Sequence, residues 1–299
     1  MHRTPSHRPR SLARGLTALA ASALLLPLAA RAQADPAARA RNQPVEPYRI
    51  VGNLYYVGAS NAVSLLFVTP AGHILLDGGF AETAPMIRDN LRKLGFRVED
   101  VKILLNSHAH FDRAGGLAQL KSWSGATLAA GEKDAASLER GGRGDFAFGD
   151  QHPYPPVHVD RRLRDGDTVS LGGTTLTAHL TAGHTPGCLT WSAPIAADGK
   201  AVHFVLAGST TINPNVHLLD KPGYPGIAAD YERTFAVLKA LPCDVCLAPH
   251  AALPDASGRS GMGPNGKETA DPKAYRDYIA QTEEAIRQQL AEEKGPRPR

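Results

Sequence analysis

The sequence predicts an α/β fold in which stacked β-sheets lie between helical layers. Strand-like segments fall into two groups, one in each half of the chain, and segments of helical periodicity accompany each group. No break in composition marks a linker, and no strong tandem repeat is present. The roughly 265 residues that follow residues 1–34 fit one large α/β domain or two small ones.

The first group of elements begins after residue 48, with turn residues such as those at 69–72 between short strands. Residues 81–94 carry apolar side chains at helical spacing, and the run at residues 101–105 is typical of a strand covered on both faces. The expected strands of this half are residues 49–51, 54–57, 64–68, 73–76 and 101–105, and the expected helices are residues 81–94 and a segment from about 115.

The second group repeats the alternation more loosely. Residues 227–241 and 271 to about 293 have apolar side chains at helical spacing. The expected strands are residues 168–171, 175–180, 189–193, 203–206 and 245–248, with a tight turn at 183–187.

Residues 1–34 have the pattern of a secretory signal peptide. Four arginines precede a largely apolar run at residues 16–30, and small residues follow it. Cleavage is expected after Ala32 or Ala34. The run is too short for a comfortable membrane span, and an uncleaved anchor is the alternative. The sequence therefore predicts a periplasmic protein, with residues 35–299 as a single domain and no membrane segment in its mature form.

The net charge of the chain comes mainly from this N-terminal segment. The full sequence has 33 basic and 29 acidic residues, a formal charge of +4. Residues 1–34 contain five arginines and no acidic residue, so the rest of the chain carries −1. This balance gives no support for binding of nucleic acid or of an anionic membrane.

A histidine-rich stretch follows the expected strand at residues 101–105. His108, His110 and Asp112 are each two residues apart. Two histidines at this spacing in an extended segment project to the same side, so both imidazoles reach one ion. Asp112 adds a hard oxygen ligand. Imidazole and carboxylate without thiolate are typical of a catalytic zinc site with an open coordination position.

Two further histidines follow expected strands. His184 lies in the sequence AGHTPG and His250 in LAPH. A ligand directly after a strand is held at the edge of a rigid sheet, where a metal site needs it. We therefore expect His184 and His250 to complete the set begun by the histidine-rich stretch.

These residues resemble the metallo-β-lactamase superfamily, which shares His-x-His-x-Asp, a later Gly-His-Thr-Pro-Gly and a late histidine after a strand. Residues 142–150 (GRGDFAFGD), 165–168 (DGDT) and 183–188 (GHTPGC), with features between residues 224 and 250, are most similar to subclass B3. The resemblance covers nearly all of the mature chain. It implies an αββα sandwich, with two mixed β-sheets face to face and helices outside.

The resemblance implies a first Zn²⁺ on His108, His110 and His184, and a second on Asp112, His250 and a histidine directly after the aspartate. Arg113 occupies that last position. Arginine stays protonated in proteins and has no lone pair to offer, so it cannot be the ligand.

Three interpretations of the second site remain open. A second ion binds weakly through Asp112, His250 and water; the enzyme works with one zinc while Arg113 supplies positive charge; or the site has decayed. Substitute ligands are conceivable at loop histidines, although an ordinary loop position is the simpler interpretation for each. These are His152, His158 and His217.

The resemblance also implies the chemistry, hydrolysis of the β-lactam ring of penicillins, cephalosporins and carbapenems. Zinc lowers the pKa of bound water towards about 7, and the hydroxide attacks the ring carbonyl. Asp112 orients the nucleophile, and Arg113 stabilises the leaving nitrogen if it faces the pocket. A related hydrolase of lactones or other esters is the alternative enzyme, and a non-catalytic zinc-binding protein is the alternative class.

Substrate contacts are expected from residues around the strand ends. Ser209 and Thr211 match a serine-rich B3 segment that recognises the substrate carboxylate, unless these hydroxyls merely satisfy the turn backbone. The loops at residues 59–62 and 213–224 are expected to rim the pocket. Asp77 matches a superfamily position and is expected to brace the site. A monomer is the default oligomeric state.

The three cysteines form no closed disulfide framework, because their number is odd. Cys243 and Cys246 lie in a stretch expected to be a strand, where a spacing of three points side chains to opposite faces and disfavours a bond. Cys188 is expected to be a packed small hydrophobe. By resemblance, Cys243 matches half of a common B3 disulfide, whose partner position holds Tyr275, so that bond is expected to be absent.

Overall fold

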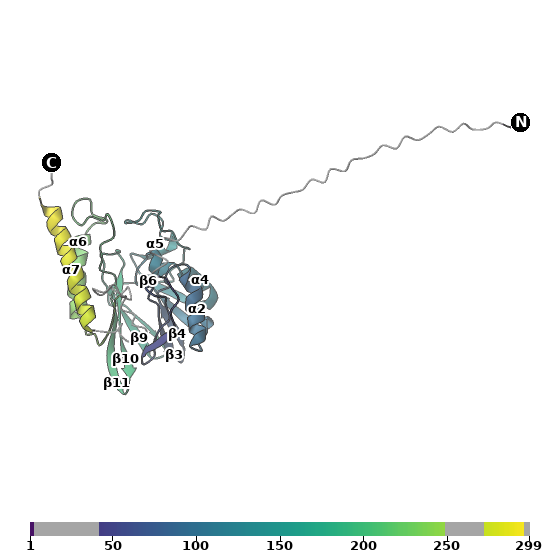
Figure 1. Cartoon of the computed structure of the whole chain (residues 1–299), viewed down its shortest axis with the longest axis horizontal. Helices are drawn as coiled ribbons and strands as arrows, with labels where there is room; N and C mark the ends of the chain where they lie inside the picture. Colours follow the sequence, from purple (N-terminus) through teal and green to yellow (C-terminus); the bar gives the residue numbers. More distant parts are fainter. Residues whose placement is uncertain (3–41, 249–271, 296–299) are drawn as a thin grey trace. The chain divides into compact units, whose positions relative to one another are not determined.

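The computed structural model describes residues 1–2, 42–248 and 272–295 of the chain (Figure 1). Apart from the first two residues, these belong to the compact unit Asp35–Arg299. The expected signal peptide and its cleavage positions, Ala32 and Ala34, lie outside the described residues, as does His250. Among the described helices, none combines the length and the apolar character that a membrane span requires.

The N-terminal half forms a seven-stranded mixed sheet. Its strands lie in sequence order, with antiparallel pairing from β1 to β4 and parallel pairing from β4 to β7. The strands are β1 (Tyr48–Val51), β2 (Leu54–Tyr56), β3 (Leu65–Thr69), β4 (Gly72–Leu76), β5 (Val101–Leu105), β6 (Thr127–Gly131) and β7 (Arg161–Leu163).

The C-terminal half forms a five-stranded sheet in the order β12-β11-β10-β9-β8. All its pairs are antiparallel except β11 with β12, so this sheet is mixed as well. The strands are β8 (Thr168–Leu171), β9 (Thr174–Leu180), β10 (Leu189–Ala197), β11 (Lys200–Leu206) and β12 (Val245–Leu247).

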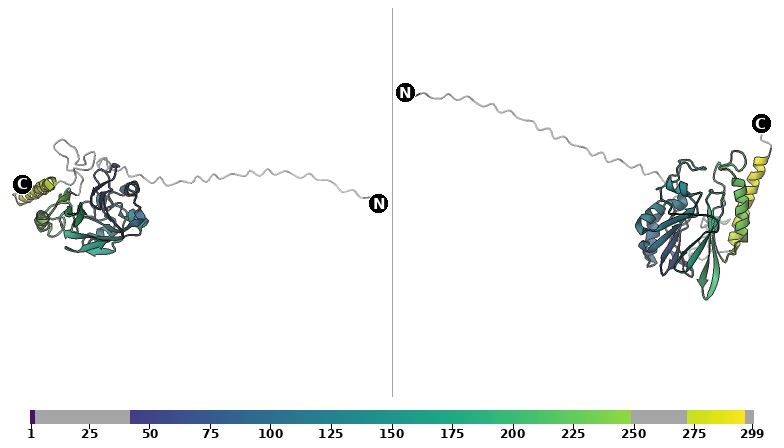
Figure 2. Two further views of the ribbon diagram at one scale, coloured as in Figure 1. Left: turned by 90° about the horizontal axis from the view of Figure 1, so that it is seen from below. Right: turned by 180° about the vertical axis from the view of Figure 1, so that it is seen from behind.

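Helices cover the outer face of each sheet (Figures 1 and 2). Apolar residues of α2, α4 and α5 pack against the first sheet, and those of α6 and α7 pack against β11 and β12 of the second. The helices are α2 (Thr83–Lys93), α3 (Phe111–Ala114), α4 (Leu117–Ser124), α5 (Ala135–Glu139), α6 (Ile227–Ala240) and α7 (Pro272–Lys294), with a 3₁₀ turn η1 (Val98–Asp100). This arrangement confirms the predicted αββα sandwich.

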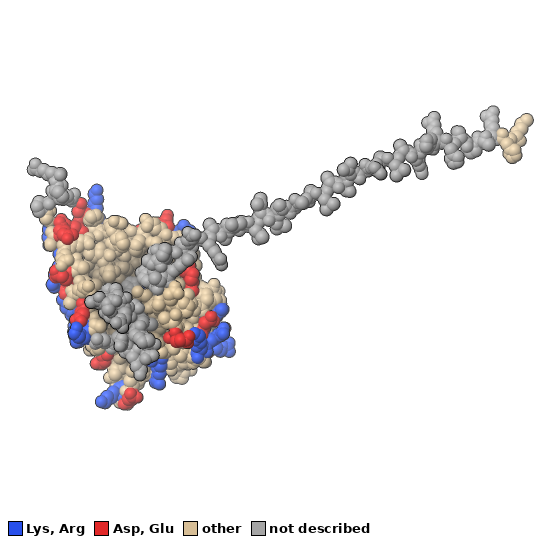
Figure 3. All heavy atoms as spheres, in the orientation of Figure 1, with Lys and Arg blue, Asp and Glu red and all other residues tan. Residues whose placement is uncertain are grey.

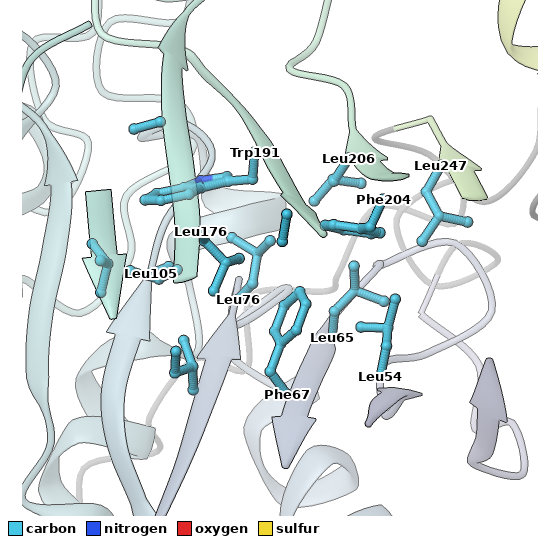
Figure 4. Close-up of a cluster of buried hydrophobic side chains, with 14 of the residues drawn as sticks. Leu54, Leu65, Phe67, Leu76, Leu105, Leu176, Trp191, Phe204, Leu206 and Leu247 are labelled. Carbon is cyan, nitrogen blue, oxygen red and sulfur yellow. The ribbon is translucent and has the colours of Figure 1, made fainter. Parts of the chain in front are cut away.

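The main core lies between the two sheets (Figure 4). Leu54, Leu65 and Phe67 of the first sheet face Phe204 and Leu206 of the second. The rings of Phe67 and Phe204 meet edge to face, with centroids 5.4 Å apart. Burying such a side chain stabilises the folded state by about 1.5–3 kcal/mol. This packing holds both sheets rigidly at the edge where the histidine loops leave them.

Two features near the site depart from the sequence prediction. The strands β6 and β7 and the short helix α5 between them were not anticipated. The sequence of β6, TLAAG, is short and rich in small residues, so its pairing with β5 rather than its own propensity makes it a strand. A separate turn of helix, α3, also begins at Phe111, before the helix expected from about residue 115.

The expectation that Cys243 and Cys246 do not bond was wrong, because the structure contains this disulfide. Only Cys246 lies on β12, which begins at Val245. Cys243 precedes the strand in a turn where the amide of Asp244 donates to the carbonyl of His203. The alternation of a strand therefore does not apply to the pair. Cys188 is free and buried, as expected, and burial raises the pKa of its thiol.

The surface drawn in Figure 3 carries acidic and basic side chains interspersed around the edges of the described region. Exposed ion pairs occur among the described residues, for example between Arg164 and Glu132 at 3.0 Å. Exposed pairs of this kind contribute little to stability.

Candidate metal centre

Two loops from different sheets bring three histidines together. His108 and His110 lie between β5 and α3, and His184 lies between β9 and β10. One ring nitrogen from each histidine lies within 4.8 Å of the others, and all three side chains are buried. Among the described residues, this is the cluster whose side chains are arranged to hold a metal ion.

Thr211 determines which nitrogen of His184 faces the cluster. The Nδ1 atom of His184 lies 2.8 Å from the carbonyl oxygen of Thr211, which can only accept, so Nδ1 carries the proton. The same carbonyl accepts the Tyr231 hydroxyl at 2.9 Å. The amide of Asn213 donates to the His184 carbonyl at 2.7 Å. The Nε2 atom of His184 is therefore left with its lone pair directed towards His110.

Asp145 acts on His110 in the same way. Its Oδ2 atom lies 3.6 Å from Nε2 of His110, and its Oδ1 atom accepts the amides of Ala147 and Phe148 at 2.8 and 2.9 Å. Burial raises the pKa of this carboxyl, but His110 and the two amides outweigh burial and hold the pKa below its ordinary value. The Asp145 carboxylate therefore faces Nε2 of His110, while Nδ1 of the same ring faces His184.

The resulting donor set fits a metal cation. Nδ1 of His110 and Nε2 of His184 lie 3.0 Å apart, while the other ring nitrogen of His184 faces the Thr211 carbonyl and that of His110 faces Asp145. When both nitrogens are unprotonated, their lone pairs repel at this distance unless a cation lies between them. Neutral imidazoles are preferred ligands of zinc, and histidine ligands commonly donate their second N–H to a carboxylate or a carbonyl. The three histidines therefore fit zinc.

Buried polar groups hold the loop that carries His108. Asp77 accepts the side-chain amide of Asn106 at 3.1 Å and both the amide and the hydroxyl of Ser107, at 2.7 and 2.6 Å. Burial raises the pKa of Asp77 to about 6, and the positive charge of Arg113 acts in the opposite direction. These contacts match the bracing role expected for Asp77.

Asp112 and Arg113 lie on α3 beside the histidine loop, and both are buried. Asp112 is not a member of the three-histidine cluster. Burial raises the pKa of Tyr278 on α7, and the charge of Arg113 lowers it. The Tyr278 hydroxyl accepts the hydroxyl of Thr210 at 2.8 Å. Tyr278 thus ties α7 to the segment that holds the expected substrate-binding residues.

The expected substrate-binding residues follow β11. The hydroxyls of Ser209 and Thr211 lie 3.3 Å apart, and the Thr211 hydroxyl is 3.4 Å from Nδ1 of His184. Ser209 is fully buried, whereas Thr211 is partly exposed. Both loops expected to rim the pocket reach this region, because Asn213 bonds to His184 and Phe111 packs against the cluster of Ala59, Ala62 and Phe80.

The expected substitute ligands are not part of the metal cluster in the described structure. His152 stacks on Phe111, with ring centroids 4.3 Å apart. His158 is exposed beside Glu139, and His217 lies 3.7 Å from Glu293. These contacts are those of ordinary loop histidines.

Three residues that shape the site were given no role from the sequence. Asp145 lies within the stretch GRGDFAFGD, where only the resemblance drew attention to it. The Tyr154 hydroxyl donates to the carbonyl of Ala109, between the two loop histidines, at 2.6 Å. Asp134 follows the unpredicted strand β6 and bonds to the amide of Ala109 at 3.0 Å.

Comparison with known families identifies one model that covers most of the described chain. The model for the metallo-beta-lactamase superfamily matches residues 57–250. A probable metallo-hydrolase of Burkholderia pseudomallei (strain 1710b) is 32% identical over 103 residues. These residues are 34% of this chain and 34% of that relative, so the chain spans about a third of its length.

Solved structures match over most of the chain. Native FEZ-1 metallo-beta-lactamase from Legionella gormanii is 39% identical, with a TM-score of 0.78, over 85% of this chain and 99% of that chain. BJP-1, a subclass B3 metallo-beta-lactamase of Bradyrhizobium japonicum, is 36% identical (TM-score 0.74; 84% and 96% covered). LRA-12, a class B3 di-zinc enzyme from an Alaskan soil metagenome, is 34% identical (TM-score 0.76; 83% and 95% covered).

Proposed function

The chain belongs to the metallo-β-lactamase superfamily, and from this premise we propose that it is a zinc-dependent β-lactamase of the B3 type. The observation that carries the proposal is the buried cluster of His108, His110 and His184, whose ring nitrogens lie within 4.8 Å of one another. Zinc bound there would lower the pKa of a bound water towards about 7 and polarise a substrate carbonyl. The substrates are penicillins, cephalosporins and carbapenems.

Asp112 and Arg113 have separate roles in this proposal. Asp112, on the turn of helix that follows His110, accepts a proton from the attacking water and orients it. Arg113 supplies the fixed positive charge that stabilises the negative charge on the lactam nitrogen as the C–N bond breaks. The active form then holds one zinc, and His250 is a ligand only in a form that binds a second ion. The buried position of Arg113 supports its role, because a charge acts more strongly where water is excluded.

Thr211 and Ser209 share the recognition of the substrate carboxylate. Thr211 is partly exposed and donates from its hydroxyl, while the fully buried Ser209 holds that hydroxyl from 3.3 Å away. We expect Thr211→Val to raise KM more than it lowers kcat, because the contact is made equally in the ground state and in the transition state.

The N-terminal segment fits this function. A signal peptide at residues 1–34 would deliver the domain formed by residues 35–299 to the periplasm, where β-lactams meet their targets. N-terminal sequencing of the protein recovered from the periplasm tests this, with a new terminus at residue 33 or 35 as the expected result.

The direct test is hydrolysis of a penicillin and of a carbapenem by the purified mature protein, before and after chelation. We expect turnover that a chelator abolishes and that added zinc restores. Protein that contains zinc but hydrolyses neither drug would overturn the β-lactamase assignment. Turnover of lactone or other ester substrates would then identify the alternative hydrolase, and inactivity towards these as well would indicate a non-catalytic zinc-binding protein.

A further inference from the structure

Asp134 is a buried carboxylate that contacts both histidine loops. It lies between β6 and α5 and is 2% exposed. Its Oδ2 atom accepts the amide of Ala109 at 3.0 Å and the hydroxyl of Thr185 at 2.7 Å. Its Oδ1 atom accepts the amide of Gly187 at 2.8 Å. Each partner is a donor, so both oxygens of Asp134 act as acceptors.

These three bonds join segments that are distant in sequence and come from different sheets. Ala109 lies between His108 and His110, and Thr185 directly follows His184. The Asp134 carboxylate therefore bonds to residues that directly adjoin the three histidines of the cluster in the sequence. The chemistry of the cluster requires the same two loops to stay at a fixed separation, because imidazole nitrogens bind zinc at about 2.0–2.1 Å.

The close approach of the loops depends on glycine at position 187. A Cβ atom added there would lie 2.4 Å from the amide nitrogen of Asp134 and 2.7 Å from its Cγ. No side chain fits at these distances. The backbone of the His184 loop can thus reach Asp134 directly at Gly187, in addition to the contact of the Thr185 hydroxyl.

We propose that Asp134 is a positioning residue that sets the separation between the His108–His110 pair and His184, and through it the affinity for zinc. This inference rests on the zinc-binding part of the proposed function. It assigns to Asp134 no contact with substrate. Asp134 instead fixes the backbone from which the three ligands project, and Asp145 and Thr211 fix the orientation of two of the rings.

Asparagine at this position tests the proposal sharply. It has nearly the volume of aspartate, but its NH₂ group must replace one of the two acceptor oxygens. On one side the NH₂ group meets the amide of Gly187, and on the other it meets the amide of Ala109. Either choice sets two donors against each other and separates one loop from the carboxamide.

The experiment compares full-length mature proteins freed of metal. Zinc affinity is measured by competition with a chromogenic chelator, and the visible spectrum of the Co²⁺-substituted protein reports the coordination geometry. We expect Asp134→Asn to bind Zn²⁺ about 10- to 100-fold more weakly, the range typical of partners that orient metal ligands. Its Co²⁺ spectrum should lose intensity, as the ligand set departs from tetrahedral.

Leu91→Ala is the matched control. Leu91 is fully buried on α2, on the outer face of the first sheet, so its truncation destabilises the fold without touching either loop. If Asp134 served only to stabilise the fold, a Leu91→Ala variant that lowers the free energy of unfolding by the same amount would weaken zinc binding as much as Asp134→Asn does. We expect the zinc affinity and the Co²⁺ spectrum of Leu91→Ala to match the wild type.

Zinc affinity of folded Asp134→Asn that falls by less than about tenfold would overturn the proposal. If this variant does not fold, Thr185→Val decides, because it removes one donor to Oδ2 and keeps the carboxylate; unchanged zinc affinity there also overturns it. A wild-type protein that binds zinc but opens no β-lactam would contradict the proposed substrate while the test of Asp134 stands. A wild-type protein that binds no zinc would overturn both.

Discussion

The three-histidine cluster and the adjacent Asp112–Arg113 pair lie only a few residues apart, yet they are built in opposite ways. In the cluster, the outer ring nitrogen of His184 faces the Thr211 carbonyl and that of His110 faces the Asp145 carboxylate. The neighbouring pair contains its own buried cation in Arg113. A fixed positive charge repels a cation placed beside it, and the repulsion is stronger where water is excluded. The first region is therefore arranged to hold a metal ion, whereas under the proposed function the second disfavours one, because Arg113 is positively charged and offers no lone pair.

The largest expected effect comes from removing a member of the cluster. His110→Ala should abolish tight zinc binding and lower kcat/KM at least about 1000-fold, because metal polarisation of the substrate is worth several kcal/mol and each 1.36 kcal/mol is a factor of ten. Metal analysis and steady-state kinetics measure both. His152→Ala is the control, since His152 stacks on Phe111 outside the cluster. Retention of zinc and of turnover by His110→Ala would contradict the assignment.

The second prediction concerns the cation of the neighbouring pair. Arg113→Ala should lower kcat about 100-fold, at the lower end of the range found when one group that stabilises developing charge is lost, and should leave zinc content at one per chain. The pKa of Asp77 should also rise above its value of about 6, because Arg113 opposes the effect of burial there.

Arg113→His separates charge from ligation in this region. Histidine restores a lone pair at the position and removes the fixed charge, so we expect a second zinc to bind to this variant. A wild-type protein that already binds two zinc ions tightly would contradict the claim that the region of Asp112 and Arg113 disfavours a metal ion.

A smaller effect is expected from the carboxylate that orients His110. Asp145→Asn should weaken zinc binding about tenfold, because a neutral amide no longer favours the proton on Nε2 of His110. Asp150→Asn is the matched control in the same loop, since Asp150 is exposed and accepts the amide of Gly144, with no contact to the histidine cluster among the described residues. Equal zinc affinities of the two variants, measured by chelator competition, would show that Asp145 does not act on the metal.

The smallest effect concerns a histidine remote from the site, and it separates acid unfolding from loss of metal. His179 on β9 contacts the Ser192 hydroxyl at 2.8 Å, and burial lowers its pKa. The unfolded chain therefore binds the proton more readily, and the stability that neutral His179 contributes is lost as the pH falls below about 6.5. His179→Gln should flatten this slope in the metal-free protein, as measured by denaturant unfolding between pH 7 and 5. If the dependence of the free energy of unfolding on pH is unchanged in this variant, groups other than His179 cause the loss of stability in acid.

The sequence predicted the sandwich and the histidines because both depend on local patterns. The apolar runs of β5 and of helix α6 are evident in the sequence alone, and so is the His108–His110 spacing. Asp134 was missed because β6 is a strand only through its pairing with β5, and because its three bonds connect segments up to 53 residues apart. The Cys243–Cys246 disulfide was missed because strand alternation was extended to a residue that precedes the strand.

The most direct test of the account is titration of metal-free protein with Zn²⁺, while penicillin hydrolysis and bound zinc are followed together. The account predicts that hydrolysis reaches its full rate at one zinc per chain, bound by His108, His110 and His184. Hydrolysis that appears only with a second equivalent, or zinc binding without hydrolysis at any ratio, would contradict it.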